Sequence, residues 1–315
     1  MKIPNLFLLS GLLFIGCNAS KQAGKSSMRE NNGVFSLHLP NQVMEIDPAS
    51  GAKVSALKID GYNFLTDSLV HREYWGSSFW LSPESVWSWS AKEIDQKPYT
   101  SRIQKGKIVM RSPRSIRTGL TITKKFSSDP KSKSFIIEYT ITNVSDSVKD
   151  LAPWEVTRVH TDGIAFFPFG EGKRRGGLLP FTVENEHISW YQYRAEEVPL
   201  NGDRQLYSDG SEGWLAEVNG QTILVQRFAD LPLEKNAPEE GEVEWYASPV
   251  AAGKSYVEVE HQGPYTHLQP GQSLIWKSEW FLRKLPSEIK AEVGNSRLVD
   301  YVRKIVNQRC SQLSF

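Results

Sequence analysis

Cysteine is nearly absent from this chain, and few histidines are present. Of the two cysteines, Cys17 ends the N-terminal apolar segment and Cys310 lies near the C-terminus, so no intramolecular disulfide is expected. The histidines and cysteines lack the spacing of a structural zinc site, and no EF-hand loop for calcium is found. The sequence therefore predicts no metal and no cofactor, and a fold stabilised by its hydrophobic core alone.

An excess of one charge is also missing. The chain has 37 Lys and Arg against 36 Asp and Glu, and loss of Lys2 with an N-terminal signal would leave 36 of each. A balanced chain without a basic block is a poor candidate for binding nucleic acid. Long hydrophobic segments are missing beyond the first residues, so no second segment is expected to enter a membrane.

The N-terminus has the pattern of a bacterial lipoprotein signal. Lys2 precedes the apolar segment Leu6–Ile15, which is too short to span a bilayer and ends at Gly16-Cys17. We expect residues 1–16 to be cleaved, Cys17 to carry the lipid and residues 17–32 to form a flexible tether. The protein would then be anchored in the bacterial cell envelope, at the outer membrane. The alternative is an ordinary signal peptide with an incidental cysteine.

Short strand-like segments separated by turn residues fill residues 33–285. Lys53–Ile59, for example, is followed by the hairpin signal Asp60-Gly61. Many short strands with few amphipathic helices between them predict an all-β, antiparallel sandwich or barrel domain. After Pro286 the apolar spacing becomes helical, which predicts a short C-terminal helix within residues 286–315.

Two late strands carry glutamates two residues apart, Glu242 with Glu244 and Glu258 with Glu260. Because strand side chains alternate, each pair shares one face, and the intervening valines pack on the other. A concave face of this kind would be a site where carboxylates bind sugar hydroxyls or transfer protons. A solvated face is the commoner explanation for glutamates in strands.

Tryptophan is concentrated in Tyr74–Trp89, a segment with Ser and Gly that is more typical of a loop than of a strand. Its flat indole faces suit stacking on a pyranose ring, so its four tryptophans are candidate substrate-binding residues: Trp75, Trp80, Trp87 and Trp89. The alternative is that they fill the core beneath a long loop.

A second candidate segment is Ala152–His160. If it is extended, Glu155 shares a face with Thr157, while Arg158 shares the other with Trp154 and Val156. A buried Arg158 needs an acidic partner, which one of the paired glutamates can supply. His160 is a candidate general acid, although a single histidine at a strand end is more often structural.

These motifs resemble known proteins. Glu260-His261-Gln262, with Leu268-Gln269-Pro270-Gly271 before a final strand, resembles the closing segment of the galactose mutarotases (aldose 1-epimerases). Asp47–Ile59 resembles their opening hairpin, and Tyr139–Asn143 the strand before their catalytic histidine. Three segments together resemble an uncharacterised family of bacterial, often secreted proteins in the mutarotase-like superfamily: Tyr74–Trp89, Ala152–Arg158 and Glu258–Pro264.

The resemblance implies a β-supersandwich of two large antiparallel sheets with a sugar on its concave face. Glu260 would be the catalytic base. Where mutarotases have a histidine as acid, this chain has Trp154-Glu155, with His160 a few residues later, so the acid would be Glu155 or His160. Arg158, Glu244, Gln262 and the tryptophans would bind the substrate, with Glu155, Glu244 and Glu260 converging on one cleft.

Two classes of function remain open, because fold does not determine reaction. One is a membrane-anchored, carbohydrate-active enzyme, such as an aldose epimerase or related isomerase. The other is a protein that binds a glycan without turnover, or a structural lipoprotein of the same fold. In either class we expect a sugar or glycan ligand, and a membrane contact only through the N-terminal lipid.

Overall fold

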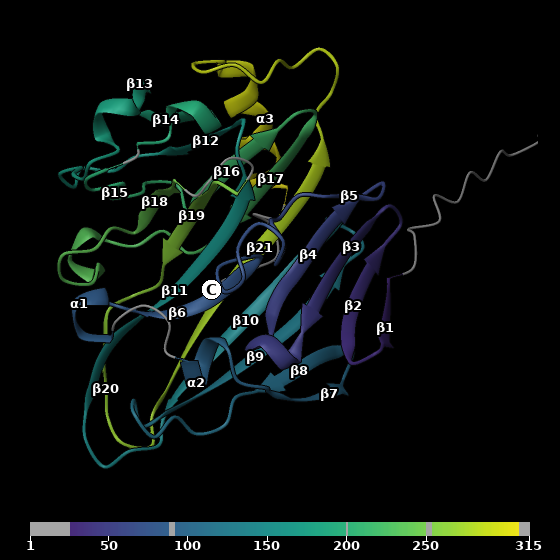
Figure 1. Cartoon of the computed structure of the whole chain (residues 1–315), viewed down its shortest axis with the longest axis vertical. Helices are drawn as coiled ribbons and strands as arrows, with labels where there is room; N and C mark the ends of the chain where they lie inside the picture. The colour runs from purple at the N-terminus through teal and green to yellow at the C-terminus, as the bar shows by residue number, and fades with distance from the viewer. Residues whose placement is uncertain (1–25, 88–91, 200, 250–253, 309–315) are drawn as a thin grey trace, which may run out of the picture.

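Two antiparallel β-sheets face each other in the computed structural model, which describes residues 26–87, 92–199, 201–249 and 254–308. The longest helix, α3 (Ser296–Asn307), lies beside the second sheet (Figure 1). The all-β fold with two large sheets and a short C-terminal helix is therefore confirmed. None of the helices in these ranges is long and apolar enough to cross a membrane.

The first sheet has eleven strands and contains both of the glutamate-bearing strands. Its strands, in spatial order, are β1 (Ser27–Asn31), β2 (Val34–Leu39), β3 (Gln42–Asp47), β4 (Lys53–Ile59), β6 (Ser77–Ser82), β11 (Lys149–His160), β19 (Tyr256–Gln262), β18 (Val243–Ser248) and β15 (Gln205–Ser208), with β5 (Tyr62–Asn63) beside β4 and β20 (Thr266–Leu268) beside β11.

The second sheet has ten strands. Its strands, in spatial order, are β13 (Val183–Asn185), β14 (Ile188–Tyr193), β12 (Gly163–Pro168), β16 (Trp214–Asn219), β17 (Thr222–Arg227), β21 (Ser273–Lys284), β10 (Ser134–Asn143), β9 (Leu120–Asp129), β8 (Lys107–Arg111) and β7 (Thr100–Gln104). The short helices are α1 (Glu84–Trp87) and α2 (Lys92–Asp95), with 3-10 turns at Pro48–Ser50, Leu179–Phe181, Ala195–Glu197 and Leu233–Lys235.

The main core lies between the two sheets. Strand alternation sends Val257 and Val259 of β19 and Trp245 of β18 into it, where they pack with residues of the second sheet such as Leu224. A second cluster lies on the outer side of the second sheet, where Leu298 of α3 is fully buried. The molecule is therefore layered as helix, sheet, core and sheet, and the first sheet keeps one face away from the core.

Two local predictions were wrong. Residues 27–31, assigned to the tether, form the edge strand β1, which the apolar pattern could not reveal because its side chains are mostly exposed and it pairs through the backbone. Within Tyr74–Trp89, which resembles a loop in sequence, Ser77–Ser82 forms β6 in the middle of the first sheet. A strand buried on both faces needs no alternation of polar and apolar residues.

The hairpin predicted at Asp60-Gly61 is confirmed. Both residues have positive φ, 49° and 85°, and connect β4 to β5. This pair of left-handed residues matches the twist of the flanking strands, which is why an Asp-Gly sequence marks such turns.

Candidate functional site

The strand register brings the glutamates of β18 and β19 together. Glu260 lies opposite Glu244 of β18 on one side and opposite Val156 of β11 on the other, and Glu258 lies opposite Arg158. Residues paired in this way share a face of the sheet. Since their neighbours in sequence are in the core, these side chains occupy the face that points away from the second sheet.

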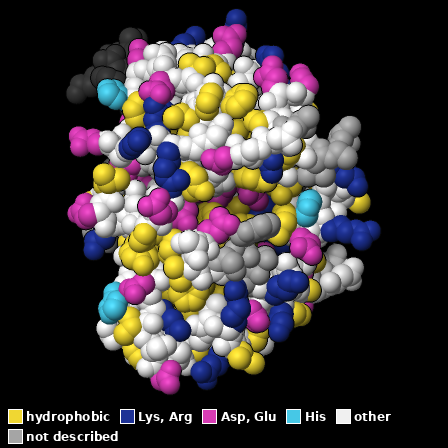
Figure 2. Space-filling model, turned by 60° about the vertical axis from the view of Figure 1, so that its left-hand side comes forward, with side chains coloured by type: hydrophobic (Ala, Val, Ile, Leu, Met, Phe, Trp, Pro, Cys, Tyr) yellow, Lys and Arg dark blue, Asp and Glu magenta, His cyan; other side chains and the backbone are white. Residues whose placement is uncertain are grey.

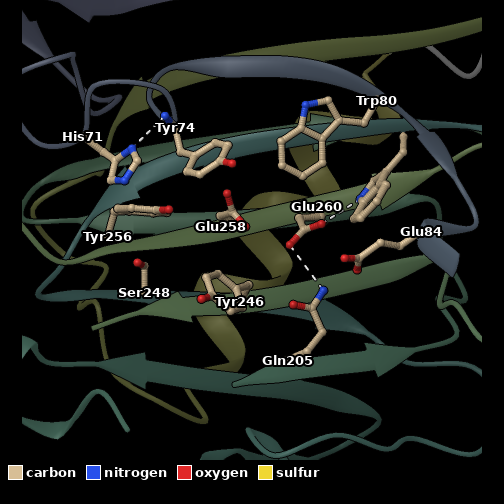
Figure 3. Close-up of a pocket in the computed structure, with 11 residues that line it drawn as sticks. His71, Tyr74, Trp80, Glu84, Gln205, Tyr246, Ser248, Tyr256, Glu258 and Glu260 are labelled. Carbon is tan, nitrogen blue, oxygen red and sulfur yellow. Dashed lines mark hydrogen bonds between the residues drawn. The ribbon is translucent and has the colours of Figure 1, made fainter. Parts of the chain in front are cut away.

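A pocket of about 280 Å³ opens over this face. Figure 3 shows Glu258 and Glu260 side by side, with Tyr74 and Trp80 on one side, Tyr246 and Gln205 on the other, and His71 and Glu84 at opposite ends. One face of the molecule is hollowed near its middle, where hydrophobic and acidic side chains gather as they do in this pocket (Figure 2). The residues lining the pocket are His71, Tyr74, Trp80, Glu84, Trp154, Gln205, Tyr246, Ser248, Tyr256, Glu258 and Glu260.

Glu260 is buried and held by neutral donors. The indole Nε1 of Trp154 donates to its Oε2 at 2.7 Å, and Nε2 of Gln205 lies 3.5 Å from its Oε1. Burial, followed by the nearby Glu258, raises the pKa of Glu260 well above its ordinary value. Burial therefore favours the protonated carboxyl of Glu260, which can act as a hydrogen-bond donor or a general acid.

Arg158 is the cation next to this face, and it is fully buried. Its Nε donates to Oε1 of Glu258 at 2.7 Å and its Nη1 donates to the hydroxyl of Ser78. Its guanidinium carbon lies 5.0 Å from the ring centre of Trp80 and 5.5 Å from that of Tyr74. Burial alone would lower the pKa of Arg158, but Glu258 raises it overall, so the two form a buried ion pair beneath the aromatic rings.

Glu244 lies at the edge of the pocket floor and holds two amides in place. Its Oε1 accepts from Nε2 of Gln262 and from the backbone of Gly241, both at 2.8 Å, and its Oε2 accepts from Nε2 of Gln205 at 2.7 Å. Burial and then Glu240 raise the pKa of Glu244 well above its ordinary value. Glu244 and Gln262 therefore support the pocket through Gln205, which lines it.

His71 supplies an imidazole that the sequence did not single out. Its Nδ1 accepts from the backbone N–H groups of Glu73 and Tyr74, at 3.2 Å and 3.0 Å, and its ring stacks on Tyr74 with centres 4.8 Å apart. Since Nδ1 is an acceptor, the hydrogen of the neutral ring is on Nε2. Burial, followed by Arg158, lowers the pKa of His71, which favours the neutral ring, and its Nε2–H can then donate a hydrogen bond to a ligand.

Glu155 does not join the pocket, which corrects the predicted convergence. It lies one residue away from the pocket-facing positions, so its side chain enters the core, where Nε2 of His261 lies 2.9 Å from its Oε1. Trp280 and Gln226 donate to the same oxygen. Burial alone would raise the pKa of Glu155, but the attraction and hydrogen bond of His261, with the bond from Tyr139, lower it. It is a structural anion and not a substrate acid.

His160, the other candidate acid, lies at the end of β11 and is only partly buried. Its position pairs with Tyr256, which lines the pocket, but His160 itself is not among the lining residues. The position at the strand end explains this, because the pocket lies over the middle of β11.

The tryptophans divide between pocket and core. Trp80 lines the pocket and packs edge to face on Trp154 with ring centres 5.3 Å apart. Trp87 belongs to the main core, and its Nε1 donates to the backbone oxygen of Asp150 at 3.0 Å. Trp75 lies under Nζ of Lys53, 5.2 Å from its ring centre, and is not among the lining residues. Trp89, like Cys17, lies outside the described residues.

Several lining residues were missed although a signal was present. Tyr246 and Ser248 follow Glu244 at intervals of two on β18, and Tyr256 precedes Glu258 in the same way on β19. Extending the alternation along both strands would have found them. His71, Glu84 and Gln205 come from three separate segments and have no such signal.

A metal site is not evident in the described ranges, where no group of three or more His, Cys, Asp or Glu side chains is placed to hold an ion. What the pocket offers instead is an imidazole N–H, a buried carboxyl with a raised pKa and several aromatic faces on one surface. Such a surface can bind a small polar ring and transfer protons to and from it.

Solved structures of similar fold include galactose mutarotase-like proteins. One, from Lactobacillus casei, has a TM-score of 0.55 and 12% identity over 82% of this chain and 100% of that one. A candidate aldose 1-epimerase from Klebsiella pneumoniae has a TM-score of 0.57 and 12% identity over 90% and 87%. Identities this low show the fold alone.

A TPR-domain containing protein from Parabacteroides distasonis has a TM-score of 0.57 and 14% identity over 82% of this chain. This chain spans about half of that protein's length, 49%. No curated protein matches the sequence. The two-sheet architecture is thus galactose mutarotase-like, which confirms the fold implied by the sequence resemblance.

Residues 82–283 match the family model described as "Domain of unknown function (DUF4380)". The matched segment begins at the end of β6 and ends within β21, so it contains β11, β18 and β19 and most of the lining residues. Since the match covers more than half of the chain, this protein belongs to the DUF4380 family.

Proposed function

We propose that this protein binds a carbohydrate of about one sugar ring in the pocket over β11, β18 and β19. The observation that carries the proposal is the joint lining of the pocket by aromatic rings and by carboxyl and amide groups. Its volume of about 280 Å³ is near the lower end of the range of about 300–1,000 Å³ for small-molecule sites. The mutarotase-like fold of the chain favours a sugar among ligands of that size.

The two kinds of lining residue suit the two sides of a sugar ring. Trp80 and Trp154 present indole rings, whose faces attract the C–H groups of a pyranose. Glu260, Glu258 and Gln205 lie together in the pocket and present oxygens and an amide to hydroxyl groups. A ligand lying between them would bury its apolar face and bond its hydroxyls at the same time.

Interconversion of sugar anomers is the second candidate function, and the buried carboxyl of Glu260 in the pocket, with its raised pKa, favours it. Ring opening needs a base that takes the proton of the anomeric hydroxyl and an acid that gives a proton to the ring oxygen as its bond to the anomeric carbon breaks. A single carboxyl can make both transfers, because its O–H gives a proton to the ring oxygen while its other oxygen takes the proton of the anomeric hydroxyl, and the raised pKa of Glu260 suits this role. His71 can assist only as a hydrogen-bond donor, because its Nε2 carries the hydrogen and its Nδ1 accepts from two backbone N–H groups. Reversing both transfers closes the ring on either face. Glu260 would then be acid as well as base, which extends the base role expected of it.

Saturation-transfer and exchange NMR on α/β mixtures of glucose and galactose tests both functions. Binding predicts saturation transfer from protein to sugar, and turnover predicts faster exchange between the anomeric signals. Glu260→Gln should abolish the exchange, whereas Glu234→Gln, an exposed glutamate outside the pocket, should retain it.

Transfer without accelerated exchange would reject the isomerase and keep the binding function. No transfer to any sugar of the panel would reject both. Anchoring of the protein by a lipid on Cys17 is part of the same proposal and is tested separately below.

A further inference from the structure

The charged side chains that line the pocket are all acidic. Three carboxyl groups line it, those of Glu84, Glu258 and Glu260, and its described lining includes no lysine or arginine. Arg158 lies close by but is fully buried, and its Nε is committed to Glu258. One of the three carboxylates is therefore neutralised within the protein, and two are not.

Glu260 and Glu84 form no salt bridge within the described part of the chain, although the charge of Arg158 lies near enough to Glu260 to offset part of the rise in its pKa. Glu260 accepts hydrogen bonds from Trp154 and Gln205, both of which are neutral. Burial raises the pKa of Glu84 as well as that of Glu260. Ionising a buried carboxyl without an ion-pair partner is costly, so burial favours the protonated form of Glu260 in the free protein. A positively charged group entering the pocket would supply that counter-charge.

The aromatic rings favour the same kind of ligand. Trp80 packs edge to face against Trp154 and against Tyr74, with interplanar angles of 84° and 80° and ring centres 5.3 Å and 6.2 Å apart. Tyr246 lies across the pocket from Tyr74 and Trp80 (Figure 3). Aromatic faces attract cations through the negative charge above the ring. Trp80 and Tyr74 already hold the buried Arg158 guanidinium at 5.0 Å and 5.5 Å, which shows that these rings suit a cation. Aromatic rings beside carboxyls that have no ion pair therefore favour an ammonium group over a hydroxyl.

We infer that the ligand of this pocket is an amino sugar, a single sugar ring that carries a free, protonated amine. The ammonium group lies between Glu260 and the aromatic rings and donates to the Glu260 carboxylate, while the ring hydroxyls meet Gln205 and Glu258. This inference rests on the proposed sugar-binding function and adds to it the charge of the substrate.

The groups that face Glu260 and Glu258 set the pH dependence of binding. Those with charge or a titratable proton include Arg158 on β11, Tyr256 on β19, Glu244 on β18 and Glu240 before it, Glu84 on α1, Asp95 on α2 and His71 before β6. Arg158 is already paired, and the neutral His71 does not repel a cation. Because burial favours the protonated form of Glu260 in the free protein, binding of an ammonium to its carboxylate releases that proton into solvent.

The test compares matched sugars by isothermal titration calorimetry at pH 7: glucosamine with glucose and galactosamine with galactose, with the N-acetylated forms as neutral controls. A charge-assisted contact predicts that at least one amine binds more tightly than its neutral counterparts by about tenfold or more. Titration in buffers of different ionisation enthalpy should show about one proton released per amine bound and none per neutral sugar. Affinity for the amine should also increase as the pH rises toward the pKa of Glu260.

Glu260→Gln should reduce the amine-to-neutral affinity ratio toward one and abolish the proton release. Glu234→Gln, an exposed glutamate outside the pocket, is the matched control and should keep both. Equal or weaker binding of the amines, with neutral sugars bound, would overturn this inference and leave the proposed function standing. Binding of no sugar in either series would overturn both, with a two-dimensional NMR spectrum of each variant showing that it is folded.

Discussion

At the scale of residues, two buried glutamates have pKa values shifted in opposite directions, because their hydrogen-bond and charged partners differ. Glu155 and Glu260 are both almost fully buried glutamates on neighbouring strands. Glu155 meets His261, and its pKa is lowered, while Glu260 meets neutral donors and Glu258, and its pKa is raised. The surroundings therefore favour an anion at Glu155 in the core and a protonated carboxyl at Glu260 in the pocket, although both are glutamates of a β-strand.

Glu242 provides a measurable effect of burial on stability. Burial, followed by Asp230, raises its pKa from 4.5 to about 8. The folded state then binds the proton more tightly than the unfolded chain, so its contribution to the unfolding free energy is present below pH 4.5 and decreases as the pH rises to 8. At about 1.36 kcal/mol per pKa unit, the decrease is on the order of 5 kcal/mol. Urea denaturation from pH 4.5 to 8 should show it as a difference between wild type and Glu242→Gln.

The exposed Glu239 is the control for this measurement, because Glu239→Gln changes the same charge nearby without removing a buried carboxyl. A wild-type protein whose stability relative to Glu242→Gln stays constant over this pH range would contradict the assignment.

Trp154 and Trp87 should respond differently to truncation. Trp154 lines the pocket, so Trp154→Ala should weaken sugar binding by about 1–3 kcal/mol, the scale of a binding hot spot. Trp87 belongs to the core, so Trp87→Ala should lower the unfolding free energy by about 3–5 kcal/mol and leave sugar affinity nearly unchanged. Thermal melting and sugar titration of both variants check this, and the reverse pattern would contradict the assignment of Trp87.

At the scale of elements, the C-terminal helix and the pocket lie on the outer sides of different sheets, so a change in one is not expected to reach the other. Helix α3 packs on the outer side of the second sheet, whereas the pocket lies on the outer side of the first, with the main core between them. Its N-terminus is capped by Asn295, whose side chain accepts from the backbone of Arg297. The helix is thus expected to act on stability without touching the ligand.

Leu298→Ala tests this separation. Leu298 is fully buried in α3 against the second sheet, so its truncation should lower the unfolding free energy by about 2–5 kcal/mol. Sugar affinity measured below the melting temperature should stay within error of wild type. Arg297→Ala, at an exposed position of the same helix, should change neither. A loss of affinity in folded Leu298→Ala would show that the layers are coupled.

At the scale of the whole molecule, the open question is attachment to a membrane. The lipoprotein pattern at Gly16-Cys17 lies outside the described residues, so it stays a prediction from sequence. Cys17→Ser removes the thiol that would carry the lipid. We expect the variant to leave the membrane fraction, or to keep its signal uncleaved, when cells are fractionated and probed by immunoblot. Labelling of wild type but not of the variant with a radioactive fatty acid would support the lipid, and identical fractionation of the two would exclude it.

The sequence by itself determined the fold class, the hairpin at Asp60-Gly61, the C-terminal helix and the common face of Glu258 and Glu260. These features depend on side-chain periodicity and turn conformation, which act over a few residues and can be read along the chain. The same periodicity placed Glu155 and Arg158 on opposite faces of the strand. The prediction that Glu155 joins the cleft was inconsistent with this alternation, and it was wrong.

Only the tertiary structure decided which of those faces became a pocket and what surrounds it. The pairing of β19 with both β11 and β18 sets Glu260 beside Glu244 and Val156, although up to about a hundred residues separate them along the chain. His71, Glu84 and Gln205 reach the same pocket from distant segments. Strand order and loop path depend on the packing energy of the whole sandwich, and the pKa of each carboxyl depends in turn on the burial and neighbours that this packing creates.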